Sequence, residues 1–593
     1  MIRSLPSSKL RAAGIAWLLE VDLCGVVYRF SSIPVEVFND DGSSYYYAGG
    51  LDAEDLDYAE KLDRLAGEAS GQEVSLEVVF PVDMAQAHRR GRLLTASTGE
   101  LSIITVQAGE ATQTREARVV VVKGDLRQPE WGHPAKPSGW AAFTIAPDTG
   151  DDVARILGAR QRVGAFTFPL GATTAQGHLW TTDSDVVRDN FGKPYPIILG
   201  NPGRWRAADD AAWQVTAGSP AYCLSYWEPQ DPVVRSTLPP AEQFWTEILL
   251  IAGHHVTANY VSIIAKDAIG SYVAQPVNAI DRFGEPIAYV DITGAGPIYG
   301  DAVNGYKNDI KQATEFWVAW GRDTLSITGA GYHNPFGPSD LRGAGDVIRW
   351  ALVRSSIAID HGAWAAVAPF LNAWKISTYI NDPDVSPWAW VQEALLPLLP
   401  LSVRFGPDGL YPILHDTGLQ SGEALIELTQ GNEVRRTSAV QAQQGPADVV
   451  TTITLEYSPR ASGTDDYQRV VVVGLADLSD TATTETVHSR VGRLAYPGDR
   501  FRTESAPVIY DDATAARIAR WMMRESSQIG HTVSYLAAPA LGHLEIGQMI
   551  ALTDHELGPM TRQPAEIIGK EWAVTGWRLT LYLIEDPARD DRS

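Results

Sequence analysis

Few residues of this sequence stand in a spacing that suggests chemistry. His254 and His255 are adjacent, so on a strand their side chains point to opposite faces and do not easily hold one metal ion. We expect one packed and one exposed histidine. Asp360 and His361 resemble an acid–base pair, but Asp360 stands where a helix N-cap is expected. Cys223 has no His or Asn nearby in the sequence, which argues against a thiol nucleophile.

The motifs of large enzyme classes are absent. The sequence has no phosphate-binding G-x-x-x-x-G-K-[ST] loop, no G-x-S-x-G nucleophile elbow and no H-E-x-x-H zinc motif. We therefore expect no catalytic residue, no cofactor and no bound metal. The two cysteines, Cys24 and Cys223, exclude a disulfide scaffold and any four-thiolate metal centre. One disulfide between them stays open, and two buried thiols in a reducing compartment are the favoured interpretation.

Tryptophan is abundant, with 18 residues in the chain. Exposed indole rings stack on sugars, so a glycan-binding surface is one interpretation. The favoured alternative is that large side chains fill gaps in loop-rich β domains. The tryptophans in or near expected loops are Trp131, Trp140, Trp205, Trp213, Trp227 and Trp245.

Length and charge narrow the class of protein. The 593 residues correspond to roughly four domains of ~150 residues. Hydrophobic residues make up 45% and charged residues 20% of the chain, as in globular proteins. With 48 basic and 72 acidic residues, the net charge is −24. Such a charge argues against a wide surface that grips nucleic acid or anionic lipid, although DNA can pass by without binding.

No segment has the features of a membrane span. The longest apolar run, residues 390–403, contains Glu393 and two prolines and is shorter than the ~20 residues that a span requires. Near the N-terminus a basic start is followed by an apolar run that ends at Glu20 and Asp22 without a small-residue cleavage site. We interpret this run as the lead into a first strand, and we expect synthesis inside the cell without export or stable membrane insertion.

Residues 1–148 have the pattern of a compact β domain. Alternating apolar residues predict a hairpin over 15–38 with its turn at Gly25. Segment 51–68 is ambiguous, because its propensity favours a helix but its leucines fit neither period. Further strands are expected over 73–80, 100–109, 114–129 and 139–147, and a short helix over 82–91.

The rest of the chain divides into a β-rich block, a helical segment and a second β-rich region. Residues 149–345 carry strand-like runs at 244–253 and 257–265 between long Gly, Pro and Trp-containing loops. The helical segment, 346–400, has three predicted helices: 346–357 with Asp346 as N-cap, 360–374 with Asp360 as N-cap, and 386–399 with Ser386 as N-cap and Pro387 at the first position. Strands over 401–485 and 528–585 flank an amphipathic helix at 512–527.

The order of these elements over 346–590 resembles that of phage tail hub proteins. The shared features are a helix, an I-x-I-D (357–360) and a helix ending in Trp374, then a V-x-T-x-I-T-L-x-Y strand (449–457). A D-x-x-T-A-x-x-x-A helix near 511 and an L-x-x-G-x-x-I-x-L-x-D strand (544–554) follow. The segment before residue 148 is similar, more weakly, to tail-tip proteins.

This resemblance implies a mainly β, multidomain fold with two tail-tube-like β-barrels. The barrels would be residues 1–148 and residues 401–593 with helix 512–527, separated by the inserted block 149–345 and a helical clamp at 346–400. The implied function is a structural baseplate or tail-tip hub in the virion. Its homotrimer would present six barrels to a six-fold tail tube and form part of the DNA exit channel.

The implied partners are the tail tube or distal tail protein, the tape measure protein, the tip spike or tail fibres, and DNA in transit without specific binding. Two alternatives stay open. One is a tail-associated glycan or cell-wall hydrolase, and the other is a receptor-binding or glycan-binding tail adhesin.

Overall fold

The structure is a computed structural model of the chain. The residues that it describes are 14–23, 25–63, 68–70, 73–79, 97–136, 139–147, 162–163, 190–205, 214–215, 217–227, 245–265, 272–281, 283–292, 316–320, 334–336, 340–355, 357–380, 382, 385–406, 408–415, 426–442, 449–459, 467–474, 500–527, 530–557, 560–573 and 575–584.

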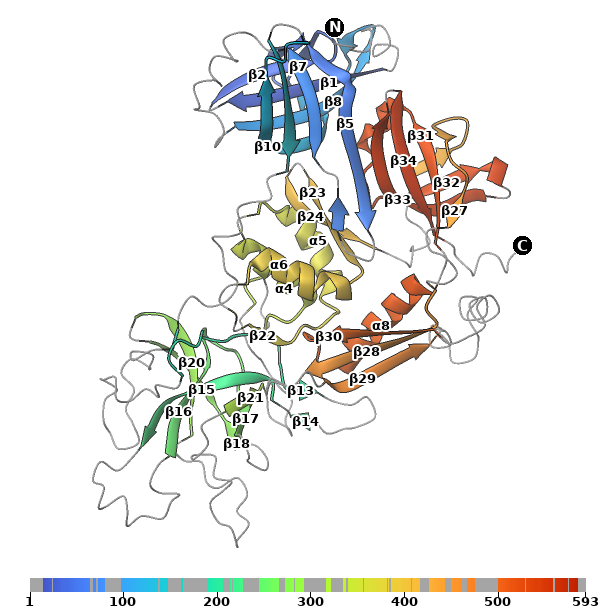
Figure 1. Cartoon of the computed structure of the whole chain (residues 1–593). Coiled ribbons are helices and arrows are strands. Elements are labelled where there is room, and N and C mark those ends of the chain that lie inside the picture. Colours follow the sequence, from blue (N-terminus) through green and yellow to red (C-terminus); the bar gives the residue numbers. More distant parts are fainter. Residues whose placement is uncertain are drawn as a thin grey trace, which may run out of the picture.

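The fold is mainly β and is built of several sheets around a small group of helices (Figure 1). Two strongly curved sheets lie side by side at one end of the molecule. A helical segment lies below them, and a third β-rich region lies at the opposite end (Figure 1). No helix in the described residues is long and apolar enough to cross a membrane.

The first sheet is formed by the N-terminal strands. Its pairing order is β5–β7–β11–β10–β8–β1–β2–β4–β3, and all pairs are antiparallel except β2–β4. Gly50 joins β4 directly to β5, so the chain itself links the two sides of the sheet, and its φ of 134° favours glycine. The strands are β1 (Ile15–Leu23), β2 (Val26–Ser31), β3 (Val35–Phe38), β4 (Ser44–Gly49), β5 (Leu51–Asp63), β7 (Val74–Val79), β8 (Ser97–Gln107), β10 (Val119–Trp131) and β11 (Trp140–Ala146), with the short β6 (Glu68–Ser70) and β9 (Glu110–Ala111).

The predicted hairpin over 15–38 is confirmed, with Gly25 in its turn at a φ of 91°. The helical propensity of 51–68 is not expressed, because β5 is a strand of 13 residues. Along β5 the side chains of Leu56, Tyr58, Glu60 and Leu62 are buried, and those of the residues that alternate with them are exposed, which is the period of a strand. Pairing with neighbours overrides the local preference here. The predicted helix 82–91 lies outside the described residues.

The second sheet comes mainly from the C-terminal region. Its pairing order is β25–β32–β33–β34–β31, and β31 also pairs with β26 and β27. A tight turn at Gly431 joins β25 to β26, so this sheet is also linked across by the chain. The strands are β25 (Ile426–Thr429), β26 (Val434–Arg436), β27 (Gln441–Ala442), β31 (His531–Ala537), β32 (Met549–Asp554), β33 (Met560–Ala573) and β34 (Gly576–Leu583).

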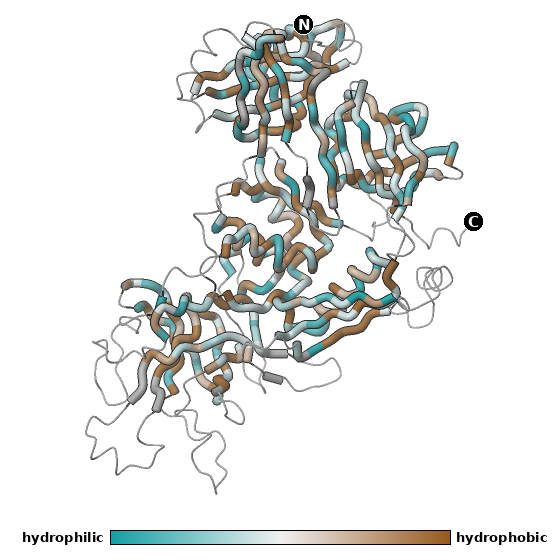
Figure 2. The backbone as a smooth tube through the Cα atoms, in the orientation of Figure 1, coloured by the Kyte–Doolittle hydropathy of each residue, from teal (hydrophilic) through white to brown (hydrophobic). Residues whose placement is uncertain are grey.

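Strand β5 belongs to both sheets. Its first part pairs with β7, and its residues Ala59–Lys61 pair with Glu571–Gly569 of β33. One hydrophobic core runs through both sheets, and the alternating hydropathy of their strands is visible in Figure 2. At its centre Trp17 packs edge-on against Trp572 with ring centroids 5.0 Å apart, and Trp577 lies 5.7 Å from Trp17. We call the two sheets together the double-sheet body.

The predicted helices are present in the helical segment. They are α4 (Ala344–Arg354), α5 (His361–Leu371) and α6 (Pro387–Ala394), the last followed by the 3-10 turn η7 (Leu396–Leu398). Asp360 and Ser386 are N-caps as predicted, and they accept hydrogen bonds from the N–H groups of Ala363 at 2.9 Å and Ala389 at 3.1 Å. Pro387 occupies the first position of α6.

The prediction that Asp346 caps α4 is wrong. The N-cap is Gly343, where a Cβ atom would lie 2.3 Å from Asn372 Oδ1. Asn372, at the C-terminal end of α5, instead reaches across and accepts a hydrogen bond from the Asp346 N–H at 3.0 Å. The first turn of α4 is therefore satisfied from a neighbouring helix, which local sequence does not reveal.

A three-stranded sheet and α8 (Asp512–Ser526) pack onto these helices in one shared core. The strands are β28 (Thr452–Pro459), β29 (Tyr467–Gly474) and β30 (Phe501–Ala506), in the order β29–β28–β30. The prediction of helix 512–527 is confirmed, but its placement against a barrel built of 401–485 and 528–585 is wrong. The strands at 452–474 form their own sheet, and α8 covers the face that carries Ile453 and Leu455.

The hairpin of β23 (Leu401–Gly406) and β24 (Gly409–Leu414) lies between the helices and the double-sheet body (Figure 1). Leu401, Val403 and Leu410 belong to the core of the helices, whereas Ile413 belongs to the core of the double-sheet body. We call the helices, this hairpin and the three-stranded sheet the helical body.

The inserted block contains a seven-stranded antiparallel sheet in the order β18–β17–β21–β15–β16–β20–β19. One face has its own core, and the other face shares the core of the helical body. The short strand β12 (Ile197–Leu199) pairs with β22 (Thr378–Ile380), so this pairing crosses the expected boundary at residue 345. The remaining strands are β13 (Arg204–Trp205), β14 (Gln214–Val215), β15 (Ser219–Trp227), β16 (Trp245–Ala252), β17 (Val261–Ala265), β18 (Tyr272–Ala274), β19 (Pro276–Ile280), β20 (Pro286–Asp291) and β21 (Phe316–Ala319).

Candidate functional site: a buried polar junction between the two bodies

The adjacent histidines lie as the sequence predicts, one packed and one exposed. His254 is buried, and its Nε2 accepts a hydrogen bond from the Ile198 N–H at 2.9 Å. Burial lowers the pKa of His254 to about 4, so the ring is neutral at neutral pH. The exposed His255 places its Nε2 3.0 Å from the carbonyl oxygen of Ala279. Both rings thus serve local structure.

The other candidates also have structural roles. Cys223 is buried in β15, and Asp360 is engaged as a helix cap. Trp140 is buried, with its Nε1 donating to Glu77 at 2.8 Å, so it presents no face to a sugar. Within the described residues no group of three or more His, Cys, Asp or Glu is placed to hold a metal ion. Outside the described side chains lie Cys24, Trp131, Trp205, Trp213, Trp227 and Trp245.

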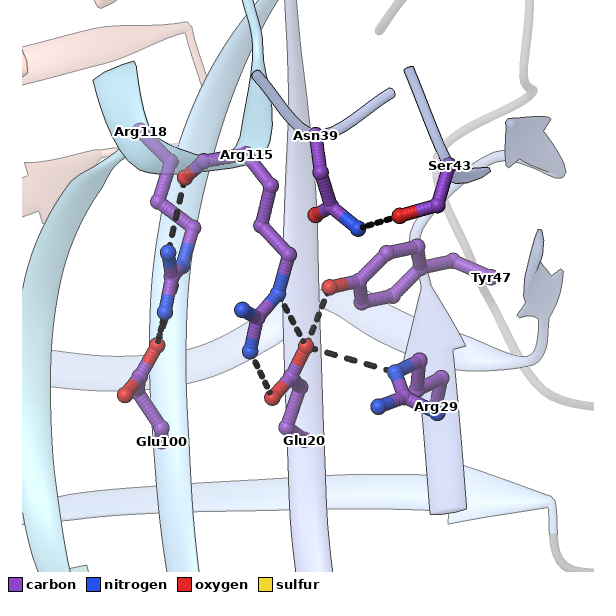
Figure 3. Close-up of polar contacts among 8 residues, drawn as sticks. All are labelled: Glu20, Arg29, Asn39, Ser43, Tyr47, Glu100, Arg115 and Arg118. Carbon is purple, nitrogen blue, oxygen red and sulfur yellow. Dashed lines mark hydrogen bonds and ion pairs between the residues drawn. The ribbon is translucent and has the colours of Figure 1, made fainter. Parts of the chain in front are cut away.

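One charged cluster fastens the strands of the first sheet (Figure 3). Glu20 of β1 accepts hydrogen bonds from Nε of Arg115 at 2.9 Å and from its Nη2 at 2.7 Å, and also from the hydroxyl of Tyr47. Burial alone raises the pKa of Glu20, but the contacts with Arg115 and Tyr47 outweigh it and lower the pKa below the usual value. Burial, with the neighbouring Glu20 carboxylate, raises the pKa of Tyr47 to about 12.

A second polar cluster lies where β5, the hairpin β23–β24 and the second sheet meet. Arg404 of β23 is 3% exposed, and its Nε donates to Glu60 of β5 at 2.9 Å. Its Nη1 donates to the hydroxyl of Tyr411 at 2.6 Å, and that hydroxyl donates to Glu545 at 2.9 Å. The guanidinium therefore connects three segments that are far apart in the sequence.

Lys570 of β33 is a second buried cation in this cluster. It is 3% exposed, donates to the carbonyl of Gly542 at 2.7 Å and lies 4.5 Å from the centre of the Trp577 ring. Burial lowers the pKa of Lys570 to about 8, with Glu60 and Glu545 favouring the charged form and Arg404 opposing it. Glu60 and Glu545 thus favour the charged form of both cations.

Three further side chains of the cluster form a serine–histidine–glutamate relay. The Oγ of Ser402 lies 2.6 Å from Nε2 of His415, and Nδ1 of His415 lies 3.0 Å from Oε1 of Glu566. The order of atoms is that of an acyl-transfer triad. However, Ser402 has no exposed surface, so no substrate carbonyl reaches its Oγ in this conformation. The relay joins β23 and the end of β24 to β33.

We call Glu60, Ser402, Arg404, Tyr411, His415, Glu545, Glu566 and Lys570 the polar junction. Sequence reasoning did not find it, because its members lie up to 510 positions apart and no local motif links them. One signal was present: Arg404, Glu566 and Lys570 interrupt otherwise apolar strand segments, and a charge on a buried strand face requires partners.

Residues 422–565 match the model of a protein family described as "Putative phage tail protein". The matched segment runs from just before β25 into β33 and includes β28–β30 and α8. The match supports the interpretation of this chain as a structural protein of a phage tail. A search of curated proteins found no significant match.

Several solved structures of tail proteins are similar to this chain. A 43 kDa tail protein of prophage MuSo2 from Shewanella oneidensis is 11% identical, with 67% of this chain and 95% of that chain covered at a TM-score of 0.26. A tail protein from Neisseria meningitidis MC58 is 9% identical, with 96% and 97% covered at a TM-score of 0.34. A chain of a gene transfer agent virion is 12% identical, with 67% and 85% covered at 0.37.

Proposed function

We propose that this chain is the hub of a phage tail tip or baseplate. The observation that carries the proposal is the double-sheet body, in which two curved sheets share one core and one strand, β5. In each sheet a short connection joins strands from opposite sides of the sheet. Gly50 joins β4 to β5 in the first sheet, and the turn at Gly431 joins β25 to β26 in the second. A common plan in two sheets of one chain is what a ring with two similar units per subunit requires.

In this proposal three chains assemble into a ring, and each contributes its two sheets as tube-like barrels. Six similar units then face the six-fold tail tube, while the three-fold symmetry of the chains matches the tip. Open strand edges on each unit are covered by its neighbour, which gives the ring cohesion and removes an aggregation hazard. The partners are the tail tube or distal tail protein on one side, and the tape measure protein and the spike or fibres on the other.

The net charge of −24 is consistent with a channel through which DNA passes. Three chains carry about −72, and an acidic wall does not hold phosphates. The complete burial of Ser402 argues against hydrolysis by the relay of Ser402, His415 and Glu566, because a nucleophile must be accessible to its substrate.

The proposal is tested with the purified full chain by light scattering and electron microscopy. We expect a trimer whose ring has three-fold symmetry and two superposable sheets per chain alternating around a pore. In the same preparation, duplex DNA at low salt should run unshifted in a gel. A ring in which this chain repeats six times, two sheets that do not superpose, or tight DNA binding would each contradict the proposal.

A further inference from the structure

The polar junction lies at the connection between the double-sheet body and the helical body. The helical body contributes four side chains from the hairpin β23–β24 and the residue that follows it: Ser402, Arg404, Tyr411 and His415. Their partners Glu60, Glu545 and Glu566 all belong to the double-sheet body. The three hydrogen bonds to these glutamates thus cross from one body to the other.

Such a junction is a costly way to hold two bodies together. Removing charges from water costs several kcal/mol per ion, and an apolar contact of the same volume is often as stable or more stable. The apolar contact from the hairpin to the double-sheet body includes Ile413, which is 5% exposed. Once water reaches the junction, each charged group regains its hydration, so the open state is favoured more than at an apolar contact.

We propose that the polar junction is a latch that fastens the helical body to the double-sheet body and opens as one unit. Opening moves the hairpin β23–β24 away from β5, β6 and β33, exposes Ile413 and hydrates the hydrogen-bonded groups of the junction together. This inference rests on the geometry of the junction and holds whether or not the chain is a hub.

Lys570 makes the latch sensitive to protons. The charged groups that face it are Glu60 from β5, Arg404 from β23 and Glu545 from the loop before β32. The pKa of Lys570 is about 8 in the closed state and returns toward its ordinary value of about 10.4 when hydrated. Between these two values the open state binds the additional proton, so opening becomes less favourable as pH rises. Burial raises the pKa of both Tyr58 and Tyr411, which keeps them protonated over this range.

The test measures how often Ile413 becomes accessible. In a full-length chain with Cys24→Ser and Cys223→Ala, the variant Ile413→Cys is labelled with a thiol reagent. Rates are divided by those of the same chain in denaturant at each pH. Arg404→Met leaves Glu60 buried without its guanidinium, and we expect labelling roughly 100-fold faster or more. Arg404→Met combined with Glu60→Leu should return the rate to that of the parent or below.

The matched control is Arg578→Met. Its partner Glu571 lies 2.9 Å away on the same β33–β34 hairpin, but both side chains are nearly half exposed. We expect a change of less than about fivefold for this surface pair. Equal effects of Arg404→Met and Arg578→Met, or a double variant that labels as fast as Arg404→Met alone, would overturn the latch.

The proton dependence provides a second readout. From about pH 8 to 9.5 the corrected rate should fall by about tenfold per pH unit, as expected for one proton taken up on opening. Lys570→Met should abolish this dependence and slow labelling at pH 7. A slope that is absent from the parent, or that persists in Lys570→Met, would contradict the role of Lys570.

Discussion

Glu20 illustrates how this fold uses single charged residues on strands. Its carboxylate is mostly buried, yet it stays charged because Arg115 and Tyr47 supply hydrogen bonds that outweigh the cost of desolvation. The partners come from β4 and from the short turn η1 (Arg115–Ala117). One residue of β1 therefore fixes two other segments of the first sheet (Figure 3).

We predict that Glu20→Gln weakens the first sheet by about 1–3 kcal/mol, since a charge-assisted hydrogen-bond set is lost in a buried place. The pKa of Glu20 in the folded state lies below 4.5. Its stabilisation is therefore complete above that pH and lost as pH falls through the folded pKa. Hydrogen exchange of β1 and β2 amides should accelerate near neutral pH in the variant. Glu20→Gln should also lose part of the acid sensitivity, and an unchanged acid limb would contradict this account.

Whether a residue's role was predictable depended on the distance to its partner. Asp360 and Ser386 each cap a helix by accepting a hydrogen bond from the N–H group three residues ahead, and both caps were predicted from local sequence. Ser402, His415 and Glu566 form their relay across 13 and 151 positions, so no spacing rule reaches them. Asp346 was misassigned because the group that satisfies the start of α4 comes from Asn372 in another helix.

At the scale of elements, the turn of the β23–β24 hairpin is closely fitted to the helical body. Gly409 has a φ of 111°, and a Cβ atom there would lie 2.4 Å from the carbonyl oxygen of Ala358. The N–H of Leu410 donates to that same carbonyl at 2.8 Å. The backbone of the hairpin thus approaches the segment before α5 too closely for any side chain.

We predict that Gly409→Ala destabilises the helical body by about 2–5 kcal/mol, because left-handed strain and a backbone clash add. The control is Gly431→Ala, where φ is 90° but no atom lies within 4 Å of the added Cβ. That variant should lose only about 1–2 kcal/mol, the strain alone. Chemical denaturation followed by circular dichroism measures both. Equal losses would show that the close approach at Gly409 does not contribute.

Strands were predicted better than the sheets that they form. Most strands with alternating burial were found from sequence, since period two is a local property. The segment 51–68 stays ambiguous from sequence because its composition favours a helix, and only the pairing of β5 with β7 and β33 decides for a strand. The assignment of 452–474 to the second barrel failed for the same reason, because strand partners are not encoded in local spacing.

At the scale of the whole molecule, the three hydrophobic cores of the described residues do not follow chain order. The first core joins residues near the N-terminus to those near the C-terminus, and the second joins part of the inserted block to helices α4–α6 and α8. The seven-stranded sheet alone has a core formed almost entirely within one stretch of chain. Interdependence of distant segments is therefore a property of both the double-sheet body and the helical body.

We predict that Trp572→Ala loosens both sheets of the double-sheet body together, at a cost of about 3–5 kcal/mol. Trp572 packs edge-on against Trp17 and Trp577, with ring centroids 5.0 Å away in both cases. Hydrogen exchange over the full chain should increase in β1 and in β31–β34. The control Trp320→Ala, in the core of the seven-stranded sheet, should accelerate exchange only in that sheet. Loosening confined to β33–β34 in Trp572→Ala would contradict the shared core.

The sharing of β5 between both sheets also constrains how the chain is made. Residues 59–61 cannot pair with β33 until residues 569–571 have been synthesised. Trp17 likewise cannot pack against Trp572 until that residue leaves the ribosome, more than 550 residues later. At a synthesis rate of about 5–20 residues per second, this delay is roughly half a minute to two minutes. During this delay the nascent N-terminal sheet has an unpaired strand edge and an uncovered indole ring, and both are aggregation hazards. The double-sheet body can therefore complete its fold only after β33 and β34 have been synthesised. We expect truncated chains that lack these strands not to assemble.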